Sequence, residues 1–209
     1  MQHVSVVSFL GLLSLAAAAT PFDDYILAPS SRLLFPVSVY NTSGTVTDQG
    51  TVLNGATDGS LTLTDEGSSV SYDFGKNIAG WVSVFVTETE GEHNLTVGFS
   101  ESSTYVSYDR GDTSASVCDV SRALLRNFSD SLQPDVLSFA VNTAGNYTAS
   151  FEYQRGGFRY LTLSLRDAGT IKISNVTVNY AAIPGPDEGM RNYTGYFHSS
   201  DEQLNRLVS

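Results

Sequence analysis

The chain contains one cysteine, Cys118, among 209 residues. A single cysteine cannot form an internal disulfide, so the core has to be stable without such cross-links. We interpret Cys118 as a small buried hydrophobic side chain, with a reactive thiol or an intermolecular bridge as the alternatives. No histidine lies beside it in the sequence to indicate a nucleophile.

Positive charge is scarce. Eleven Lys and Arg residues stand against 22 Asp and Glu residues, which gives a formal net charge of −11. The basic residues are scattered, so a nucleic acid backbone or an anionic membrane surface would be repelled. We therefore expect neither as a partner. The acidity fits a soluble protein that works outside the cell.

Long apolar runs are missing beyond the first residues. Val4 to Leu15 is apolar and Ala16 to Ala19 is made of small residues. This pattern predicts a signal peptide over 1–19 and a secreted, extracellular protein. The run is too short for a membrane span, which needs about 20 apolar residues. No later segment has that length either.

Asparagine sequons are frequent. Six N-x-S/T triplets occur, none with proline in the middle position. In a secretory chain they predict a glycoprotein with these side chains near the surface. The candidate N-glycosylation residues are Asn41, Asn94, Asn127, Asn146, Asn175 and Asn192.

Charged residues make up only 16% of the chain, whereas Tyr, Phe, Val, Thr, Ser and Gly are abundant. Apolar residues recur with a period of two, which is typical of strands with one buried face. We predict an all-β fold, an antiparallel jelly-roll-like β-sandwich, over 20–181. The predicted strand segments are Leu61–Thr64, Val70–Phe74, Gly80–Thr89, Leu95–Ser100, Val136–Val141, Tyr147–Tyr153, Phe158–Leu165 and Ile171–Tyr180.

Three segments depart from this pattern. The apolar phase slips by one residue near Asn175, which predicts a β-bulge or a register break. The spacing of apolar residues within Tyr108–Asp130 is compatible with a short helix. Asn41–Asp58, rich in Thr, Gly and Asn, predicts turns or short strands.

The end of the chain changes character. Residues 182–195 have the Pro and Gly content of a linker. Over 196–209 the sequence predicts the start of a helix, with overlapping capping boxes that pair Ser199 with Glu202 and Ser200 with Gln203. The helix begins well but stops at Ser209, so we expect that a further domain normally follows.

Five segments together resemble fungal α-L-rhamnosidase-like glycoside hydrolases of family 78. They are Tyr25–Arg32 with Phe35–Val39, Tyr72–Gly80, Glu101–Ser103, Arg155–Leu163 and Gly195–Arg206. The resemblance implies that 20–181 is the N-terminal β-sandwich and that 196–209 opens an (α/α)6 barrel. It also implies that the catalytic acid and base lie beyond Ser209, so no catalytic residue is assigned in this chain. No cofactor, metal or disulfide is expected.

Within these segments we read several residues as support for the fold. Gly156 and Gly157 predict a tight turn with positive φ before a strand. Arg159 is expected to pair with a carboxylate or with backbone carbonyls, and Asp73 with Lys76 beside a turn at Gly75.

Glycoside hydrolysis needs two facing carboxylates. The candidates by residue type are Glu88, Glu90, Glu92, Glu101, Asp109, Asp112 and Glu152, and no spacing selects a pair. Asp109 and Asp112 also lack the regular oxygen spacing of a known calcium loop.

Sugar binding needs exposed aromatic faces with polar groups beside them. The candidates are Trp81, Tyr105, Tyr108, Tyr153 and Tyr193, of which Tyr105 and Tyr108 are favoured because they lie beside a loop. The leading hypothesis is a non-catalytic accessory β-sandwich of a secreted α-L-rhamnosidase-like enzyme that acts on plant glycosides or polysaccharides. The alternatives are a stand-alone carbohydrate-binding module and an inactive gene fragment.

Overall fold

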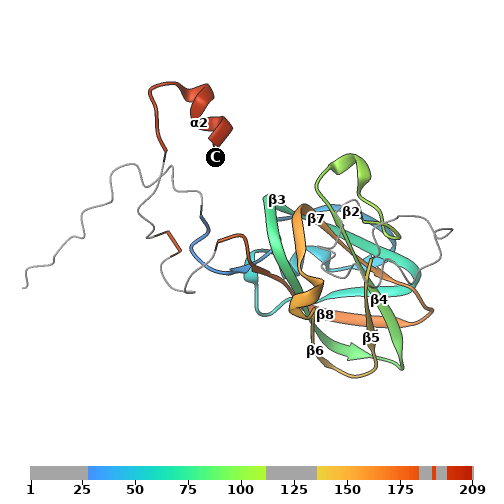
Figure 1. The fold of residues 1–209 in the computed structure, drawn as a ribbon. Coiled ribbons are helices and arrows are strands. Elements are labelled where there is room, and N and C mark those ends of the chain that lie inside the picture. The colour runs from blue at the N-terminus through green and yellow to red at the C-terminus, as the bar shows by residue number, and fades with distance from the viewer. Residues whose placement is uncertain (1–27, 112–135, 184–189, 192–196, 209) are drawn as a thin grey trace, which may run out of the picture. The chain divides into compact units, whose positions relative to one another are not determined.

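The computed structural model describes residues 28–111, 136–183, 190–191 and 197–208. The chain divides into two compact units, one of which is Pro29–Met190. The other unit contains the described residues Ala28, Arg191 and 197–208. The unit Pro29–Met190, called the first unit, is built from strands (Figure 1). A short helix near the C-terminus belongs to the other unit.

In the described ranges, eight strands form one continuous, strongly curled sheet. In chain order they are β1 (Leu33–Leu34), β2 (Ser38–Thr47), β3 (Leu61–Thr89), β4 (His93–Ser100), β5 (Leu137–Val141), β6 (Gly145–Thr148), β7 (Arg155–Leu165) and β8 (Thr170–Tyr180). Each described pair of neighbouring strands is antiparallel. Among the described residues, three 3₁₀ turns join them: η2 (Gln49–Gly55), η3 (Ser103–Tyr105) and η4 (Phe151–Tyr153).

Strand β3 passes from one layer of the fold to the other. Over Leu61–Thr64 it pairs with β8 and β2, around Ser69–Asp73 with β2 and β7, and over Gly80–Thr89 again with β8. Strand β6 pairs with Ser83–Val86. Strands β7, β4 and β5 continue the first layer, and β1 continues the second beyond β8. Buried side chains of both layers belong to one hydrophobic cluster. The prediction of an antiparallel β-sandwich is confirmed.

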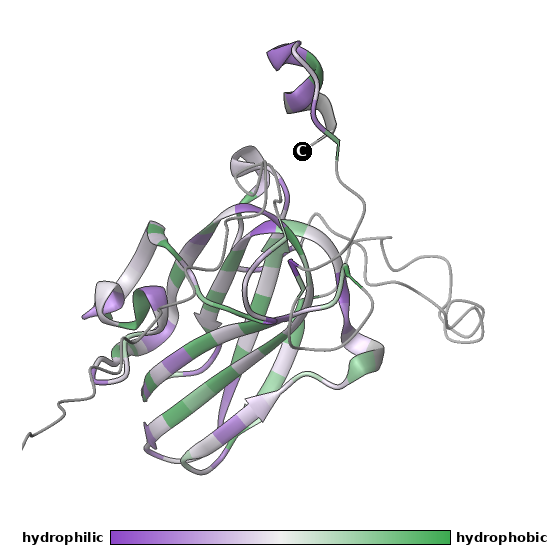
Figure 2. Cartoon of the chain, turned by 90° about the vertical axis from the view of Figure 1, so that its left-hand side faces the viewer, coloured by the Kyte–Doolittle hydropathy of each residue, from purple (hydrophilic) through white to green (hydrophobic). Residues whose placement is uncertain are grey.

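The core follows from the two-residue period of the strands. Val82, Val84 and Val86 of β3 are fully buried, whereas Phe85 between them is 41% exposed. Figure 2 shows the same alternation of hydrophobic and polar residues along the strands. Each fully buried Val or Leu contributes about 1.5–3 kcal/mol of transfer free energy. Because alternate residues face opposite sides of a strand, this pattern fixes which face of β3 meets the core.

The predicted irregularity near Asn175 is confirmed. Phe85 pairs with Asn175 of β8, but the next residue, Val86, pairs with Ile173, so Ser174 is left over. Two residues of β8 thus stand against one of β3, which is the arrangement of a β-bulge. The extra residue explains why the apolar phase of β8 changes there.

Two sequence predictions are wrong in detail. Phe151–Tyr153 was expected to extend a strand, but it forms the 3₁₀ turn η4 after β6 ends at Thr148. Asn41–Asp58 was expected to hold turns or short strands; η2 supplies a turn there, but β2 is a strand of 10 residues that runs to Thr47. In the second case pairing with the long strand β3 outweighs the turn-forming residues. Most of the predicted helix within Tyr108–Asp130 lies outside the described residues.

The glycine pair before Arg159 also differs from the prediction. Gly156 and Gly157 lie inside β7, and neither has positive φ. A Cβ atom at Gly157 would lie 2.9 Å from the side-chain nitrogen of Asn77 and 3.0 Å from a carboxylate oxygen of Glu101. Gly157 therefore does not form a turn; its missing side chain leaves room for Asn77 and Glu101 to lie close to the β7 backbone. Gly75, in contrast, has φ of 77°, as a turn there requires.

Near the C-terminus, helix α2 spans Glu202–Val208. Its start is capped by Asp201, whose Oδ1 accepts hydrogen bonds from the backbone N–H groups of Gln203 (2.9 Å) and Leu204 (3.4 Å). Asp201 therefore caps this helix where the capping boxes were predicted, and of the donors that those boxes would use it takes the N–H of Gln203. The assignment of this helix to a barrel, and the predicted domain boundaries, stay predictions.

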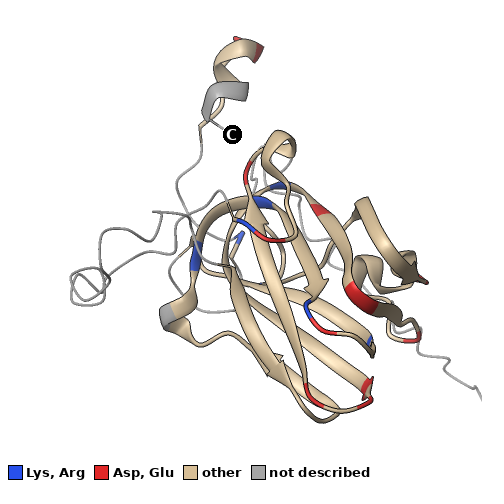
Figure 3. Ribbon diagram, turned by 90° about the vertical axis from the view of Figure 1, so that its right-hand side faces the viewer, with Lys and Arg blue, Asp and Glu red and all other residues tan. Residues whose placement is uncertain are grey.

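Charged residues are spread over the strand ends and turns of the first unit (Figure 3). Glu88 and Lys172 pair across β3 and β8 at 2.9 Å, with the Glu88 side chain 69% exposed. In the described part of the chain no helix is long and apolar enough to span a membrane.

Candidate functional site

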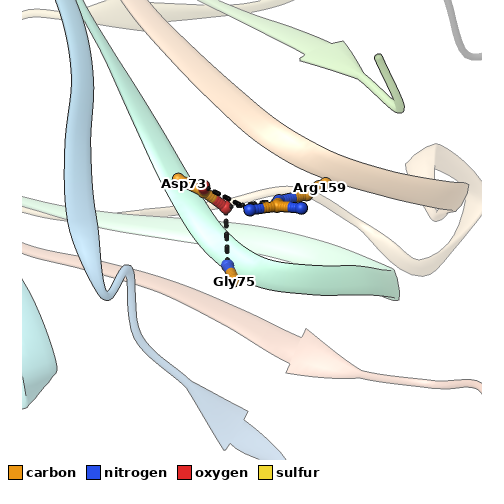
Figure 4. Close-up of polar contacts among 3 residues, drawn as sticks. All are labelled: Asp73, Gly75 and Arg159. Carbon is orange, nitrogen blue, oxygen red and sulfur yellow. Dashed lines mark hydrogen bonds and ion pairs between the residues drawn. The ribbon is translucent and has the colours of Figure 1, made fainter. Parts of the chain in front are cut away.

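One bidentate ion pair stands out on the layer formed by β2, β3 and β7. Arg159 of β7 donates from Nε to Oδ1 and from Nη2 to Oδ2 of Asp73 on β3, and both distances are 2.8 Å. The backbone N–H of Gly75 donates to the same Oδ1 at 2.6 Å (Figure 4). The positive φ of Gly75 turns the chain so that this N–H faces the carboxylate of Asp73, two residues earlier in the sequence. Register places Asp73 directly opposite Tyr160, so the ion pair crosses two adjacent strands.

The charge state of this pair is well defined. Hydrogen bonding from Arg159, together with the Gly75 N–H bond and the guanidinium charge, lowers the pKa of Asp73 despite partial burial. The hydrogen bonds and the charge of Asp73 raise the pKa of Arg159 in turn. Asp73 is thus an ionised acceptor at neutral and mildly acidic pH. The prediction that Arg159 pairs with a carboxylate is confirmed, and Asp73 makes this pair with Arg159 instead of the expected Lys76.

Two tyrosines extend from the ion pair, Tyr160 in contact with Arg159 and Tyr40 in contact with Tyr160. Tyr40 is the residue that β2 leaves unpaired between Val39 and Asn41, opposite Tyr72 and Ser71 of β3. A bulge of this kind redirects a side chain, and the ring of Tyr40 lies 4.8 Å from the ring of Tyr160, at 55° to it.

Tyr160 is 7% exposed and Tyr40 is 45% exposed, so only the second offers a ring to solvent. The guanidinium carbon of Arg159 lies 5.4 Å from the centre of the Tyr160 ring. We call Tyr40, Asp73, Arg159 and Tyr160 the tyrosine–arginine cluster. It combines an open aromatic ring with charged hydrogen-bonding groups.

Tyr105, one of the two predicted ligand residues, adjoins this cluster through its turn. The hydroxyl of Tyr40 donates to the carbonyl oxygen of Ser103 at 3.3 Å, and Ser103 begins turn η3, which ends at Tyr105. The side chain of Ser102 caps the turn by accepting from the N–H of Thr104. Tyr105 itself is 65% exposed. The turn therefore presents a second open aromatic ring on a segment that is tied to Tyr40.

Tyr108, the other predicted ligand residue, has a different environment. The guanidinium carbon of Arg166 lies 5.6 Å from its ring centre, and the residue is 47% exposed. Its loop passes over β4, because a Cβ at Gly98 would lie 3.0 Å from the carbonyl oxygen of Ser107 and 3.2 Å from that of Arg110. A cation over an aromatic ring is a stabilising contact. We therefore interpret Tyr108 as a residue that holds its loop against Arg166, and less as a ring that is open to a sugar.

The remaining aromatic candidates lie elsewhere. Trp81 is half-buried and makes an edge-to-face contact with Phe151, with ring centres 5.9 Å apart. Tyr153 is 39% exposed in η4. Tyr193 lies outside the described residues. Within the described ranges, neither the Trp81 ring nor the Tyr153 ring forms an aromatic pair with Tyr40 or Tyr160.

The structure places the described candidate carboxylates on several elements, and Glu101 follows β4 directly, close to Gly157. Glu88 pairs with Lys172 on the surface, and Glu90 and Glu92 belong to the hairpin turn between β3 and β4. The pKa of Asp109 is lowered, chiefly by the hydroxyl of Ser107. A general acid in glycoside hydrolysis needs the opposite shift. Asp112 and the side chain of Glu152 lie outside what the structure describes.

Metal binding finds no support among the described residues, which contain no group of three His, Cys, Asp or Glu side chains suited to hold an ion. His93 is buried, and one of its ring nitrogens lies 3.0 Å from the carbonyl oxygen of Glu90, inside the β3–β4 hairpin. This contact gives His93 a structural role. Cys118 lies outside the described residues.

Four of the predicted glycosylation asparagines are described. Asn41, Asn94 and Asn146 are exposed on strands β2, β4 and β6, and Asn175 is half-buried on β8. Asn127 and Asn192 lie outside the described residues. Glycosylation itself stays a prediction.

Sequence reasoning missed Tyr40 and the pairing of Arg159 with Asp73. Tyr40 sits in an alternating stretch of β2, and its exposure beside Tyr160 results from a bulge that depends on the register with β3. Asp73, Arg159 and Tyr160 all lie within the segments that resemble family 78 enzymes. That resemblance was the one sequence signal that pointed to them.

No protein-family model matches the sequence, and no curated protein matches it. Solved structures similar to this one include a family 32 carbohydrate-binding module of AlyQ in complex with 4,5-unsaturated mannuronic acid (TM-score 0.44, 10% identity, 71% of this chain and 98% of that chain). They also include a rhamnosidase from Klebsiella oxytoca with rhamnose bound (TM-score 0.43, 14% identity, 76% of this chain and 30% of that chain). A third is the family 78 rhamnosidase of Bacillus sp. GL1 (TM-score 0.41, 17% identity, 71% of this chain and 12% of that chain). The matched region thus spans less than a third of either rhamnosidase.

Proposed function

We propose that this chain is a non-catalytic, carbohydrate-contacting β-sandwich, the N-terminal accessory domain of a secreted α-L-rhamnosidase-like glycoside hydrolase. The observation that carries the proposal is the tyrosine–arginine cluster. Its open Tyr40 ring packs on Tyr160, whose ring lies against Arg159 of the bidentate pair with Asp73. Tyr105 extends from the turn to which the Tyr40 hydroxyl is bonded.

The cluster has the two kinds of group that sugars need. An aromatic ring packs against the apolar C–H face of a pyranose, and charged planar groups at its edge bind hydroxyl groups. A guanidinium has five N–H donors. Arg159 uses Nε and Nη2 on Asp73, and its side chain is 42% exposed, so further donors remain for a ligand.

The cluster is unsuited to hydrolysis on its own. A glycosidase of the common type needs one carboxyl group that is protonated near the working pH and a second carboxylate about 5–10 Å away. Asp73 is held ionised by Arg159, so it cannot supply the proton. The proposal therefore assigns catalysis to a helical barrel that follows Ser209 in the whole protein, as the family resemblance implies.

Binding by the full secreted chain tests the first part of the proposal. We would titrate it with L-rhamnose and with a rhamnose-containing plant polysaccharide, following backbone amide shifts and heat of binding. Tyr40→Ala and Tyr105→Ala should each weaken binding about tenfold or more, because loss of a stacking contact costs about 1–3 kcal/mol by analogy with base stacking. Phe151→Ala is the matched control, because Phe151 is also an exposed aromatic residue in a 3₁₀ turn.

An absence of binding to every sugar tested, or equal effects of Tyr105→Ala and Phe151→Ala, would sink the binding part. The enzyme part has its own test. The intact mass of the native secreted protein, measured after removal of glycans, should be several-fold larger than 22.4 kDa. A mass near that of the signal-cleaved chain would contradict the proposal that a catalytic barrel belongs to the same protein.

A further inference from the structure

The outward face of the second layer presents a phenylalanine between two sequon asparagines. Phe85 of β3 pairs directly with Asn146 of β6 on one side and with Asn175 of β8 on the other. Residues directly opposite in an antiparallel pair share a face, and their Cβ atoms lie about 4.5–5.5 Å apart. Phe85 is 41% exposed, so its ring is accessible to whatever is attached to these neighbours.

The amide group of Asn146 is held on this face by two hydroxyl groups. Its Oδ1 accepts a hydrogen bond from Oγ of Ser83 at 2.8 Å, and its Nδ2 donates to Oγ1 of Thr148 at 2.8 Å. The two hydroxyl oxygens are themselves 2.7 Å apart. Thr148 is the hydroxyl residue of the same sequon. The side chain is thus fixed next to Phe85 instead of swinging freely into solvent.

From this arrangement we infer that Asn146 carries an N-linked glycan whose first N-acetylglucosamine packs on the ring of Phe85. Attachment forms a bond from Nδ2 to the sugar C1 and displaces a lipid pyrophosphate from a lipid-linked oligosaccharide donor. The amide proton leaves with the lipid pyrophosphate. The bound sugar then covers an apolar ring that the bare sheet leaves in water, and this lowers the free energy of the folded state.

Asn146 suits this role better than its counterpart across Phe85. Asn146 is exposed, whereas Asn175 is half-buried beside the bulge of β8. A third sequon provides a natural comparison. Asn94 is exposed on β4, but the residue opposite it on β5 is Ala140, which offers no ring. A glycan at Asn94 therefore has no aromatic partner directly across the strand pair.

The experiment uses the full chain secreted from a eukaryotic host. Glycopeptide mass spectrometry measures the occupancy of each sequon, and thermal unfolding is compared for Asn146→Gln, Phe85→Ala and the double variant. We expect Asn146→Gln to lower the Tm by about 2–4 °C, the shift typical of a modest stabilising contact in a domain of this size. The same change in the Phe85→Ala background should have a much smaller effect, and Asn94→Gln should change the Tm little.

Phe85→Leu serves as a second variant that keeps the apolar volume and removes the ring. In the wild type, the sugar protons should show upfield shifts from the Phe85 ring, and these should vanish in Phe85→Leu. An unmodified Asn146 in the secreted protein would overturn the inference. So would a Tm loss on Asn146→Gln that is the same with and without the Phe85 ring. The inference rests on the predicted secretion and is independent of sugar binding at the tyrosine–arginine cluster.

Discussion

Asp73 and Arg159, 86 positions apart in the sequence, are joined by two hydrogen bonds of 2.8 Å that bridge strands β3 and β7. The pair lies where the regular pairing of β3 with β7 ends: the last regular partner on β3 is Asp73, and the next paired residue is Ile78. The pair therefore has a structural role as well as the proposed role in binding.

The lowered pKa of Asp73 predicts a pH dependence of stability. A carboxyl group whose pKa is lower in the folded than in the unfolded state stabilises the fold above its unfolded pKa, near 3.9 for Asp. This contribution is lost as the pH falls through the folded pKa. We expect the urea midpoint of the wild type to decrease between about pH 4 and the folded pKa, and this part of the decrease to be absent in Asp73→Asn.

The surface pair Glu88–Lys172 supplies the control for this measurement. Glu88→Gln removes a carboxylate from a largely exposed ion pair, and such pairs contribute about 0–1 kcal/mol. Its unfolding curve should therefore follow that of the wild type across the same pH range. Identical curves for Asp73→Asn and the wild type would contradict the lowered pKa.

A second prediction concerns the close approach of β3 to β8. A Cβ at Gly80 would lie 2.0 Å from the backbone carbonyl oxygen of Asn179, which cannot move without shifting β8. Gly80→Ala should reduce the free energy of unfolding by about 1–3 kcal/mol or more, as in other overpacked sites. Chemical denaturation measures the change.

Gly156→Ala is the matched variant for Gly80→Ala. A Cβ at Gly156 meets no atom within 4 Å, and its φ is not positive. We expect its stability to equal or slightly exceed that of the wild type, because alanine restricts the unfolded chain. Equal losses for the two variants would show that steric contact with Asn179 is not the cause.

The third prediction concerns the cap of helix α2. Asp201→Ala removes the acceptor for the amides of Gln203 and Leu204, and loss of such a cap costs a helix about 0.5–2 kcal/mol. Hydrogen exchange at these two amides should become faster. Ser200→Ala should leave both rates unchanged, since Asp201 provides the cap. Faster exchange in Ser200→Ala alone would restore the capping box that the sequence predicted.

Much of the strand pattern was readable before the fold was known. Alternation placed Val82, Val84 and Val86 on one face of a strand, the face that the structure buries, and the phase slip near Asn175 located the bulge of β8. Both follow from side-chain periodicity along a single strand. Local propensity failed where tertiary contacts compete with it: Gly157 serves a close approach instead of a turn, and Phe151–Tyr153 forms a 3₁₀ turn.

The sequence by itself determined a β-rich chain with its apolar faces, its sequons and its candidate aromatic residues. Tertiary structure decided which of these residues meet. The bulge that brings Tyr40 onto Tyr160, the Asp73–Arg159 pair and the position of Phe85 between Asn146 and Asn175 all depend on strand register. Register is set by how distant strands pair and bury a common core, so no local pattern encodes it.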